Sequence, residues 1–173
     1  YKTVDDNGRA SMKSLYDSLK EVLIQGDIDI VNMSISSIQD LSITTKRMLK
    51  RCIDSGVIFV APIGNNGKSE RLYPSVCDGV FSVGGTKDDL ITIGDTSNFS
   101  LDTHFVAPSE NISSKYTDII STGTSFSSAI VTGQLACLMS EYGSKEYEDF
   151  ILYCRNKNKT REMSYGILTL KEK

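Results

Sequence analysis

The chain has 173 residues, of which 39% are hydrophobic, and its formal net charge is -3 at pH 7. This length suits one globular core. The absence of a basic stripe excludes an electrostatic case for nucleic-acid binding. The longest apolar runs have the length of strands, and no charged-then-apolar signal segment opens the chain, so we expect no membrane partner.

Helical and strand-like segments alternate from the start of the chain. Residues 14–25 carry leucine and valine side chains at helical spacing, and Gly26 follows where a helix stop is expected. Residues 28–35 form a nearly continuous apolar run, which is typical of a strand buried in a parallel sheet. The opening third of the chain therefore predicts one helix followed by one buried strand.

A second helix is predicted over residues 42–55, with Gly56 as its terminator. Its inward side chains are expected to be Ile43, Met48, Leu49 and Ile53. Residues 57–63 and residues 80–83 are then predicted to be a second and a third buried strand. This alternation indicates an α/β fold with a parallel sheet and right-handed crossovers.

Two polar loops follow neighbouring predicted strands. Residues 34–37 follow the first strand and residues 64–67 follow the second. Ligands of such sheets bind outside the carboxyl ends of the strands, so both loops are expected at the functional edge. Residues 86–103, which include GDTSNFS, predict a hairpin and loop instead of a crossover.

Ser125 is the best candidate for chemistry. It lies in STGTSFSSAIVTG (residues 121–133), just ahead of an apolar run with helical spacing. A hydroxyl at a helix N-terminus lies among unpaired backbone N–H groups and the positive end of the macrodipole, which favour negative charge near its oxygen. The same residues also suit an ordinary helix N-cap, and the motif alone leaves that alternative open.

Four ordered segments resemble the subtilisin-like serine proteases. DIVNMSIS (residues 29–36) resembles the substrate-side strand of that family, and GVIFVAPIGNNG (residues 56–67) resembles the strand and loop that carry its oxyanion-hole asparagine. YPSVCDGVFSVGG (residues 73–85) and FVAPSENI (residues 105–112) are similar to the next segments toward the nucleophile. The resemblance implies a partial subtilisin-like three-layer fold with a mainly parallel sheet, and it makes residues 1–173 a single C-terminal portion of such a catalytic domain.

The resemblance assigns catalytic roles to Ser125 and Asn65. Ser125 would be the nucleophile, and the amide N–H of Asn65 with the backbone N–H of Ser125 would hold the oxygen of a tetrahedral intermediate. Gly64 and Gly67 flank the asparagine and allow the loop conformations that close approach requires. Taken alone, GNNG is also a common turn sequence, and only its order with Ser125 favours the oxyanion role.

Ser34, Ile35 and Ser36 resemble the strand that pairs with an extended substrate backbone, because an exposed edge offers N–H and C=O groups to a peptide. Gly64 is expected to border the same substrate site. The sequence departs from the family at Ser36 and Ser37, where the family has glycines, and the added side chains would narrow the groove. The loop after Gly67 is short, which predicts a reduced pocket for the first substrate side chain.

The base of the catalytic triad is missing from the matched region. In the family, the catalytic aspartate and histidine both precede it, and His104 is the only histidine here. His104 lies in SLDTHFVAP, a stretch that in the resembling fold runs along the sheet edge and away from the serine. We therefore expect a surface or structural role for His104, and Asp102 beside it does not make it a catalytic dyad.

The cysteines give no ligand pattern. They are widely spread, without a C-x-x-C pair or a nearby histidine, and the acidic residues form no spaced calcium loop, so no metal and no cofactor are expected. Their positions are Cys52, Cys77, Cys137 and Cys154. We expect Cys137 to be a buried free thiol. Secreted bacterial members of the family tend to lack cysteine, so four thiols favour a reducing, cytoplasmic compartment. Secretion stays open as the alternative.

Two functions remain open. The first is that the chain is the serine-bearing portion of an endopeptidase, inactive alone and completed by an N-terminal fragment that carries the aspartate and histidine. The second is that it is a pseudo-protease module that binds a peptide or protein partner. In either case an exposed sheet edge predicts self-association or a covering partner. Residues 147–155 predict a further helix, and GILTL (residues 166–170) resembles the family's terminal element.

Overall fold

The computed structural model describes residues 1, 3–6 and 9–157. Four parallel strands form one sheet in the order β1-β2-β3-β4. Their bounds are β1 Ile30–Asn32, β2 Ile58–Pro62, β3 Val80–Thr86 and β4 Phe105–Pro108. The helices are α1 Met12–Gln25, α2 Ile43–Asp54 and α3 Thr124–Lys157, and a hairpin of β5 Ile112–Ser114 and β6 Thr117–Ser121 precedes α3. The predicted α/β class with a parallel sheet is confirmed.

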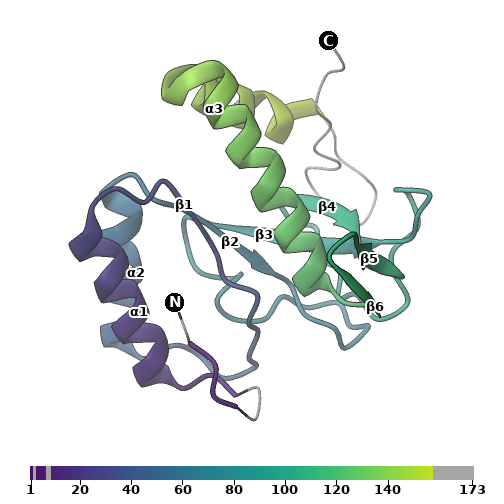
Figure 1. Ribbon diagram of the computed structural model, residues 1–173, viewed down its shortest axis with the longest axis horizontal. Coiled ribbons are helices and arrows are strands. Elements are labelled where there is room, and N and C mark those ends of the chain that lie inside the picture. Colours follow the sequence, from purple (N-terminus) through teal and green to yellow (C-terminus); the bar gives the residue numbers. More distant parts are fainter. Residues whose placement is uncertain (2, 7–8, 158–173) are drawn as a thin grey trace.

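The helices form two layers around the sheet. Helices α1 and α2 lie side by side on one side, and α3 crosses the other side (Figure 1). Strand β2 is buried on both faces because successive side chains point in opposite directions. Phe59 and Ala61 pack into the cluster with α1 and α2, whereas Val60 packs into the cluster with α3. The three-layer arrangement follows from this alternation.

Helix α1 has capping residues at both ends. The Ser11 hydroxyl accepts a hydrogen bond from the Ser14 backbone N–H, and the Ser14 side chain accepts one from the Ser11 N–H. At the other end, Gly26 adopts a left-handed conformation with φ 69°. The predicted helix is confirmed with its stop at Gly26, although it begins two residues earlier, at Met12.

Helix α2 begins after Ser42, whose side chain accepts a hydrogen bond from the Thr45 N–H. The prediction that Ile43 faces inward is wrong, because its side chain is 63% exposed. The buried positions are Thr45, Met48, Leu49 and Cys52. They follow the three- and four-residue spacing of one helix face, and Ile43 in the first turn lies off that face.

The strands differ in length from the predicted ones. β1 covers only three residues of the predicted segment 28–35, because the Ile35 N–H turns back to the Met33 carbonyl at 2.6 Å and the chain leaves the sheet. β3 runs on from residue 83 to Thr86. β4 was not predicted as a strand, since its four residues are too few for a periodic signal.

Helix α3 is one element over the region for which two helical segments are predicted. Its buried face carries Val131, Leu135 and Leu138. The predicted burial of Cys137 is wrong, since this thiol is exposed. Two residues after Leu135 a helical position has turned by about 200°, so Cys137 points away from the sheet. The terminal element predicted at residues 166–170 lies outside the described residues.

Candidate active site

Three backbone segments meet at the carboxyl edge of the sheet. Residues 34–37 follow β1, residues 64–67 follow β2, and the first turn of α3 is fixed against the end of β4. The Gly123 N–H donates to the Ser109 carbonyl at 2.7 Å, and the Ser127 hydroxyl donates to the Pro108 carbonyl at 2.9 Å. The start of α3 is thereby placed beside both loops.

Asn65 is hydrogen-bonded to the residue that precedes the candidate nucleophile. Its Oδ1 accepts from the Thr124 backbone N–H at 2.8 Å and lies 2.9 Å from the Thr124 hydroxyl. That hydroxyl also lies 3.2 Å from the Gly64 carbonyl. The structure therefore brings Asn65, Gly64 and the start of α3 together, as the sequence predicts.

The partner of Asn65 fixes the direction of its amide group. A backbone N–H can only donate, so the atom facing Thr124 must be the carbonyl oxygen of the side chain. The Nδ2 group then points the other way, and none of the described residues accepts a hydrogen bond from it. The Asn65 side chain is exposed, so Nδ2 is a donor open to a ligand.

Two glycines allow this close approach. Gly64 has φ +120°, a conformation that side chains rarely adopt, and a Cβ there would lie 2.5 Å from Asn98 Nδ2. A Cβ on Gly123, where φ is +146°, would lie 3.4 Å from Asn65 Nδ2. Both positions require glycine for backbone conformation, and Gly64 also requires it for space.

Ser125 occupies the first turn of the 34-residue helix α3 and is partly exposed. Its backbone N–H has no hydrogen-bond partner within the part of the chain that the structure describes. The first N–H groups of a helix lack internal partners, and together with the macrodipole they attract negative charge. The Ser125 N–H is therefore a second donor beside that of Asn65.

The side chain of Ser34 contacts the first turn of α3. Its hydroxyl donates to the Ser125 carbonyl at 3.0 Å and accepts from Asn32 Nδ2 at 2.8 Å, and it lies 3.4 Å from the Ser128 hydroxyl. These side-chain contacts do not test the prediction that the Ser34 backbone pairs with substrate. The observed contacts connect the end of β1 directly to the turn that carries Ser125.

Ile35 and Ser36 border a groove of about 730 Å³. The groove is also lined by apolar side chains of the N-terminal segment and α1, including Val4 and Leu15. Ser37 closes one end of this stretch, because its N–H and C=O each pair with Tyr73 at 2.9 Å. An extended peptide laid beside Ser36 would have the groove on one side.

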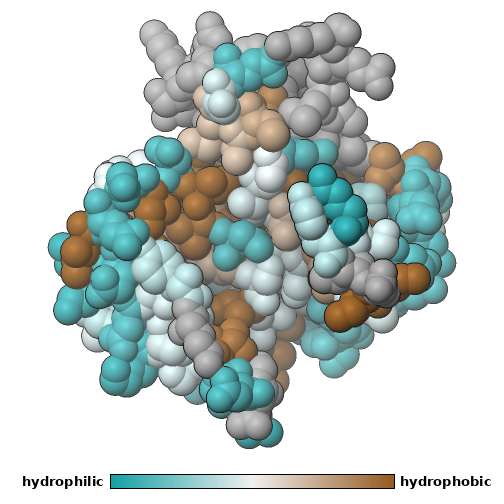
Figure 2. All heavy atoms as spheres, viewed as in Figure 1, coloured by the Kyte–Doolittle hydropathy of each residue, from teal (hydrophilic) through white to brown (hydrophobic). Residues whose placement is uncertain are grey.

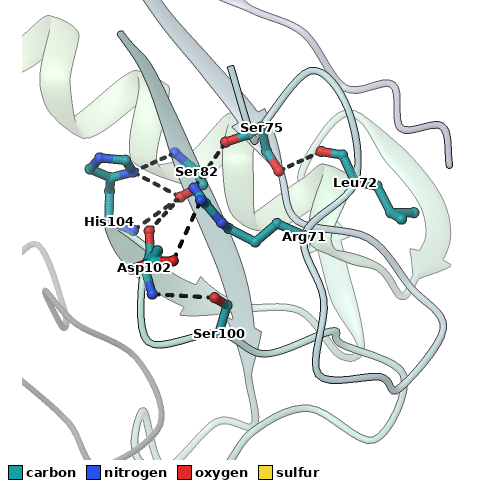
Figure 3. Close-up of polar contacts among 7 residues, drawn as sticks. All are labelled: Arg71, Leu72, Ser75, Ser82, Ser100, Asp102 and His104. Atoms are coloured by element: carbon teal, nitrogen blue, oxygen red, sulfur yellow. Dashed lines mark hydrogen bonds and ion pairs between the residues drawn. The ribbon is translucent and has the colours of Figure 1, made fainter. Parts of the chain in front are cut away.

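His104 lies away from this site, at the start of β4. The Ser82 backbone N–H donates to its Nδ1 at 3.1 Å, and the Ser82 hydroxyl lies 2.8 Å from the same nitrogen (Figure 3). Strand β4 spans four residues at about 3.3 Å each, so about 13 Å separates His104 from the edge where α3 begins. The predicted structural role of His104 is consistent with this placement.

Asp102 faces Arg71 and not the serine. Its carboxylate lies 3.8 Å from the Arg71 guanidinium, and its backbone carbonyl accepts from the Ser82 hydroxyl at 3.4 Å (Figure 3). Among the described residues, no histidine or carboxylate is hydrogen-bonded to Ser125. The site therefore has a hydroxyl and two donors, and no proton acceptor within the described part of the chain.

The described residues contain no group of three or more His, Cys, Asp or Glu side chains that could hold a metal ion. Cys52, Cys77 and Cys137 are free thiols. No helix among residues 1, 3–6 and 9–157 is both long and apolar enough to span a bilayer.

Sequence reasoning missed two residues of the site. Thr124 orients Asn65, and Asn98 binds the backbone of the loop that carries Asn65. Thr124 lies inside STGTSFSSAIVTG (residues 121–133), so its position next to Ser125 is a signal that the sequence contains. Asn98 is about 30 residues from the loop and belongs to a segment predicted only as hairpin and loop, so no spacing pattern marks it.

Comparison with known proteins identifies the family. The sequence profile of the Subtilase family matches residues 1–162. The subtilase-type proteinase RRT12 of Saccharomyces cerevisiae is 33% identical over 123 residues, and subtilisin DY of Bacillus licheniformis is 27% identical over 148 residues. The chain belongs to the subtilase family, a family of serine proteases, and the expected family resemblance is confirmed.

Solved structures agree with the fold. The prenylagaramide maturation protease PagA matches with a TM-score of 0.70 at 24% identity, and the self-cleaved protease domain of PatA matches with 0.69 at 27% identity. Each alignment covers 79% of this chain, but 52% and 54% of those chains. The chain likewise spans 25% of RRT12 and 53% of subtilisin DY.

Proposed function

We propose that this chain supplies the nucleophile and the oxyanion hole of a subtilisin-like endopeptidase whose aspartate and histidine belong to an N-terminal portion of the catalytic domain. The observation that carries the proposal is the contact between Asn65 Oδ1 and the Thr124 N–H at 2.8 Å. This contact directs Asn65 Nδ2 away from Thr124, near Gly123, and supports a donor close to the nucleophile, as acyl transfer requires.

The reaction follows the triad scheme. The Ser125 hydroxyl attacks the carbonyl carbon of the scissile peptide bond, and the histidine of the N-terminal portion accepts its proton. Asn65 Nδ2 and the Ser125 N–H donate to the resulting oxyanion. Collapse breaks the C–N bond, and the leaving amine takes the proton from the histidine. Water, deprotonated by the same histidine, then attacks the acyl carbon, the bond to Ser125 Oγ breaks, and Oγ takes the proton back from the histidine.

The substrate is a peptide or protein in extended conformation. The backbone of Ser34, Ile35 and Ser36 would pair with it, as strand addition to an exposed edge provides main-chain hydrogen bonds. The 730 Å³ groove beside Ile35 would receive one of its side chains. Gly64 borders the scissile bond, since it precedes Asn65 directly.

We expect the isolated chain to be inactive, because a serine hydroxyl is a weak nucleophile without a base. A fluorophosphonate probe tests this: the chain alone should label negligibly, and addition of a fragment with the family's aspartate and histidine segments should restore labelling. Ser125→Ala should abolish the restored labelling, whereas the control Ser113→Ala, at an exposed position on β5, should retain it. Rapid stoichiometric labelling of the isolated chain would contradict the proposal.

The alternative function is a pseudo-protease that binds a peptide or protein partner. It is favoured by the absence of a proton acceptor near Ser125 among the described residues and by Ser36 and Ser37, whose side chains narrow the groove relative to glycine. In that case an extended peptide should bind the wild type and Ser125→Ala with equal affinity, and no N-terminal fragment should restore probe labelling.

A further inference from the structure

Asn98 is a buried polar side chain in the segment between β3 and β4. Its side chain has no exposed surface, and it is among the largest fully buried side chains of the molecule. A buried amide without hydrogen-bond partners would be strongly destabilising, so its contacts indicate what it holds. The hydrogen bonds of its side chain all involve residues 63–68, the end of β2 and the loop that carries Asn65.

The side chain of Asn98 binds this loop from both sides of Asn65. Its Oδ1 accepts from the Asn66 N–H at 2.8 Å and from the Lys68 N–H at 3.2 Å, and its Nδ2 donates to the Ile63 carbonyl at 3.3 Å. The Asn98 backbone N–H donates to the Gly64 carbonyl at 3.0 Å. Four hydrogen bonds thus fix the backbone immediately before and after Asn65.

The packing against Gly64 is equally close. A Cβ added there would lie 2.5 Å from Asn98 Nδ2 and 2.8 Å from Leu72 Cδ1. The side chain of Asn98 therefore fills the space under the loop. Asn98 makes no hydrogen bond to Ser125 in the described part of the chain.

We propose that Asn98 is a positioning residue for the oxyanion hole: it holds the backbone on both sides of Asn65 so that Nδ2 stays directed at the substrate carbonyl. The proposal rests on the proposed role of Asn65. Small displacements of catalytic groups are costly, since a shift of about 1 Å lowers rates by roughly 100-fold. A purely structural role for Asn98 predicts lower stability and no specific effect on turnover.

Hydrogen exchange of this chain tests the contacts without any activity. Asn98→Ala should raise the exchange rates of the Asn66 and Lys68 amides by about 10-fold, because each loses its acceptor. The Ile91 and Thr92 amides, held in another exposed loop by Asp89 Oδ1 at 2.9 and 2.8 Å, serve as internal controls.

Two further variants keep this test decisive. Asn98→Asp retains the acceptor oxygen, so protection of Asn66 and Lys68 should fall less than in Asn98→Ala, even if the alanine variant folds poorly. Ser82→Ala removes a part-buried contact between β3 and His104, outside the loop that carries Asn65, and should leave both amides unchanged. Unchanged exchange in Asn98→Ala, or an equal rise in Ser82→Ala, would overturn the proposal.

A double-mutant cycle in the full-length protease tests the link to catalysis. Asn98→Ala should lower kcat by about 100-fold with KM within about threefold, whereas in an Asn65→Ala background it should lower kcat by less than threefold further, because it acts through Asn65. Additive losses, or an unchanged kcat in Asn98→Ala, would refute it. If Asn65→Ala alone leaves kcat intact, the proposed role of Asn65 fails, and the exchange data still decide whether Asn98 holds the loop.

Discussion

Thr124 holds the amide of Asn65 with two groups, its backbone N–H and its hydroxyl. Both lie on the side of Oδ1, and the hydroxyl also contacts the Gly64 carbonyl. Thr124 is fully buried, so its side of these contacts is shielded from water. A residue that touches no substrate thus sets the direction of a proposed catalytic donor.

Replacing the Thr124 hydroxyl should slow catalysis. Thr124→Val keeps the shape of the side chain and removes one of the two hydrogen bonds to Asn65 Oδ1, which at about 1 kcal/mol predicts a kcat roughly 5- to 10-fold lower in the active protease. Thr124→Ser retains the hydroxyl and is the matched control. Steady-state kinetics would contradict the assignment if both variants lost activity equally.

Gly64 should tolerate no side chain. Gly64→Ala introduces a clash with Asn98 and Leu72 at a φ of +120°, so it combines backbone strain with overpacking and should cost about 2–4 kcal/mol of unfolding free energy. Gly26→Ala is the control: φ is +69° and a Cβ there contacts nothing within 4 Å, so the cost is about 1 kcal/mol. Urea unfolding measures both, and equal losses would argue against steric crowding at Gly64.

At this scale the sequence predicts the residues inside contiguous motifs and misses those that act from a distance. Ser125 and Asn65 were found because each lies in a short motif with a recognisable order. Asn98 was not, because its contacts depend on how the loop after β3 folds back over the end of β2. That path is a tertiary property, and no local pattern encodes it.

At the scale of elements, the sequence predicts where helices occur and end better than it predicts which side chains face the core. Gly26 ends α1 as expected, and Ser42 caps α2. The errors at Ile43 and Cys137 share one cause: an apolar side chain near a periodic face was assigned to that face. Hydrophobicity alone does not decide burial, since folded surfaces carry many apolar atoms.

Thiol labelling separates two cysteines by their helix faces. Cys137 on α3 is exposed and should react with iodoacetamide in the native protein, whereas Cys52 on α2 has no exposed surface. Burial also raises the pKa of the Cys52 thiol, so it forms less of the reactive thiolate at a given pH. Peptide mass analysis should find Cys52 modified only after unfolding, and comparable native labelling of both would contradict the described packing of α2.

At the scale of the molecule, no strand among the described residues pairs with the outer edge of β1. Asp29 and Met33 bond to β2, at 2.8 Å each, so the alternate residues Ile30 and Asn32 direct main-chain groups away from it. Hydrophobic surface gathers around β1, between the α1 side and α3 (Figure 2). Such an edge pairs readily with another strand.

We therefore expect the isolated chain to associate through β1. Sedimentation equilibrium should show concentration-dependent mass, and Val31→Lys should reduce the association constant by at least about 10-fold, since a charged side chain blocks edge pairing. Ile24→Lys, at an exposed position on α1, is the control and should leave association unchanged. A monomer at all concentrations would show that the edge is not adhesive.

The hydrogen bonds between Asn65 and Thr124 have a consequence for the energetics of turnover. In the proposed mechanism, the folded chain aligns the Asn65 amide before any carbonyl arrives, so the reaction spends no free energy on turning this donor when the oxyanion forms. Such preorganisation transfers the ordering cost from each catalytic cycle to the single event of folding. In the proposed assignment, the chain folds with its two anion-binding donors already aligned, before the N-terminal portion supplies the proton acceptor.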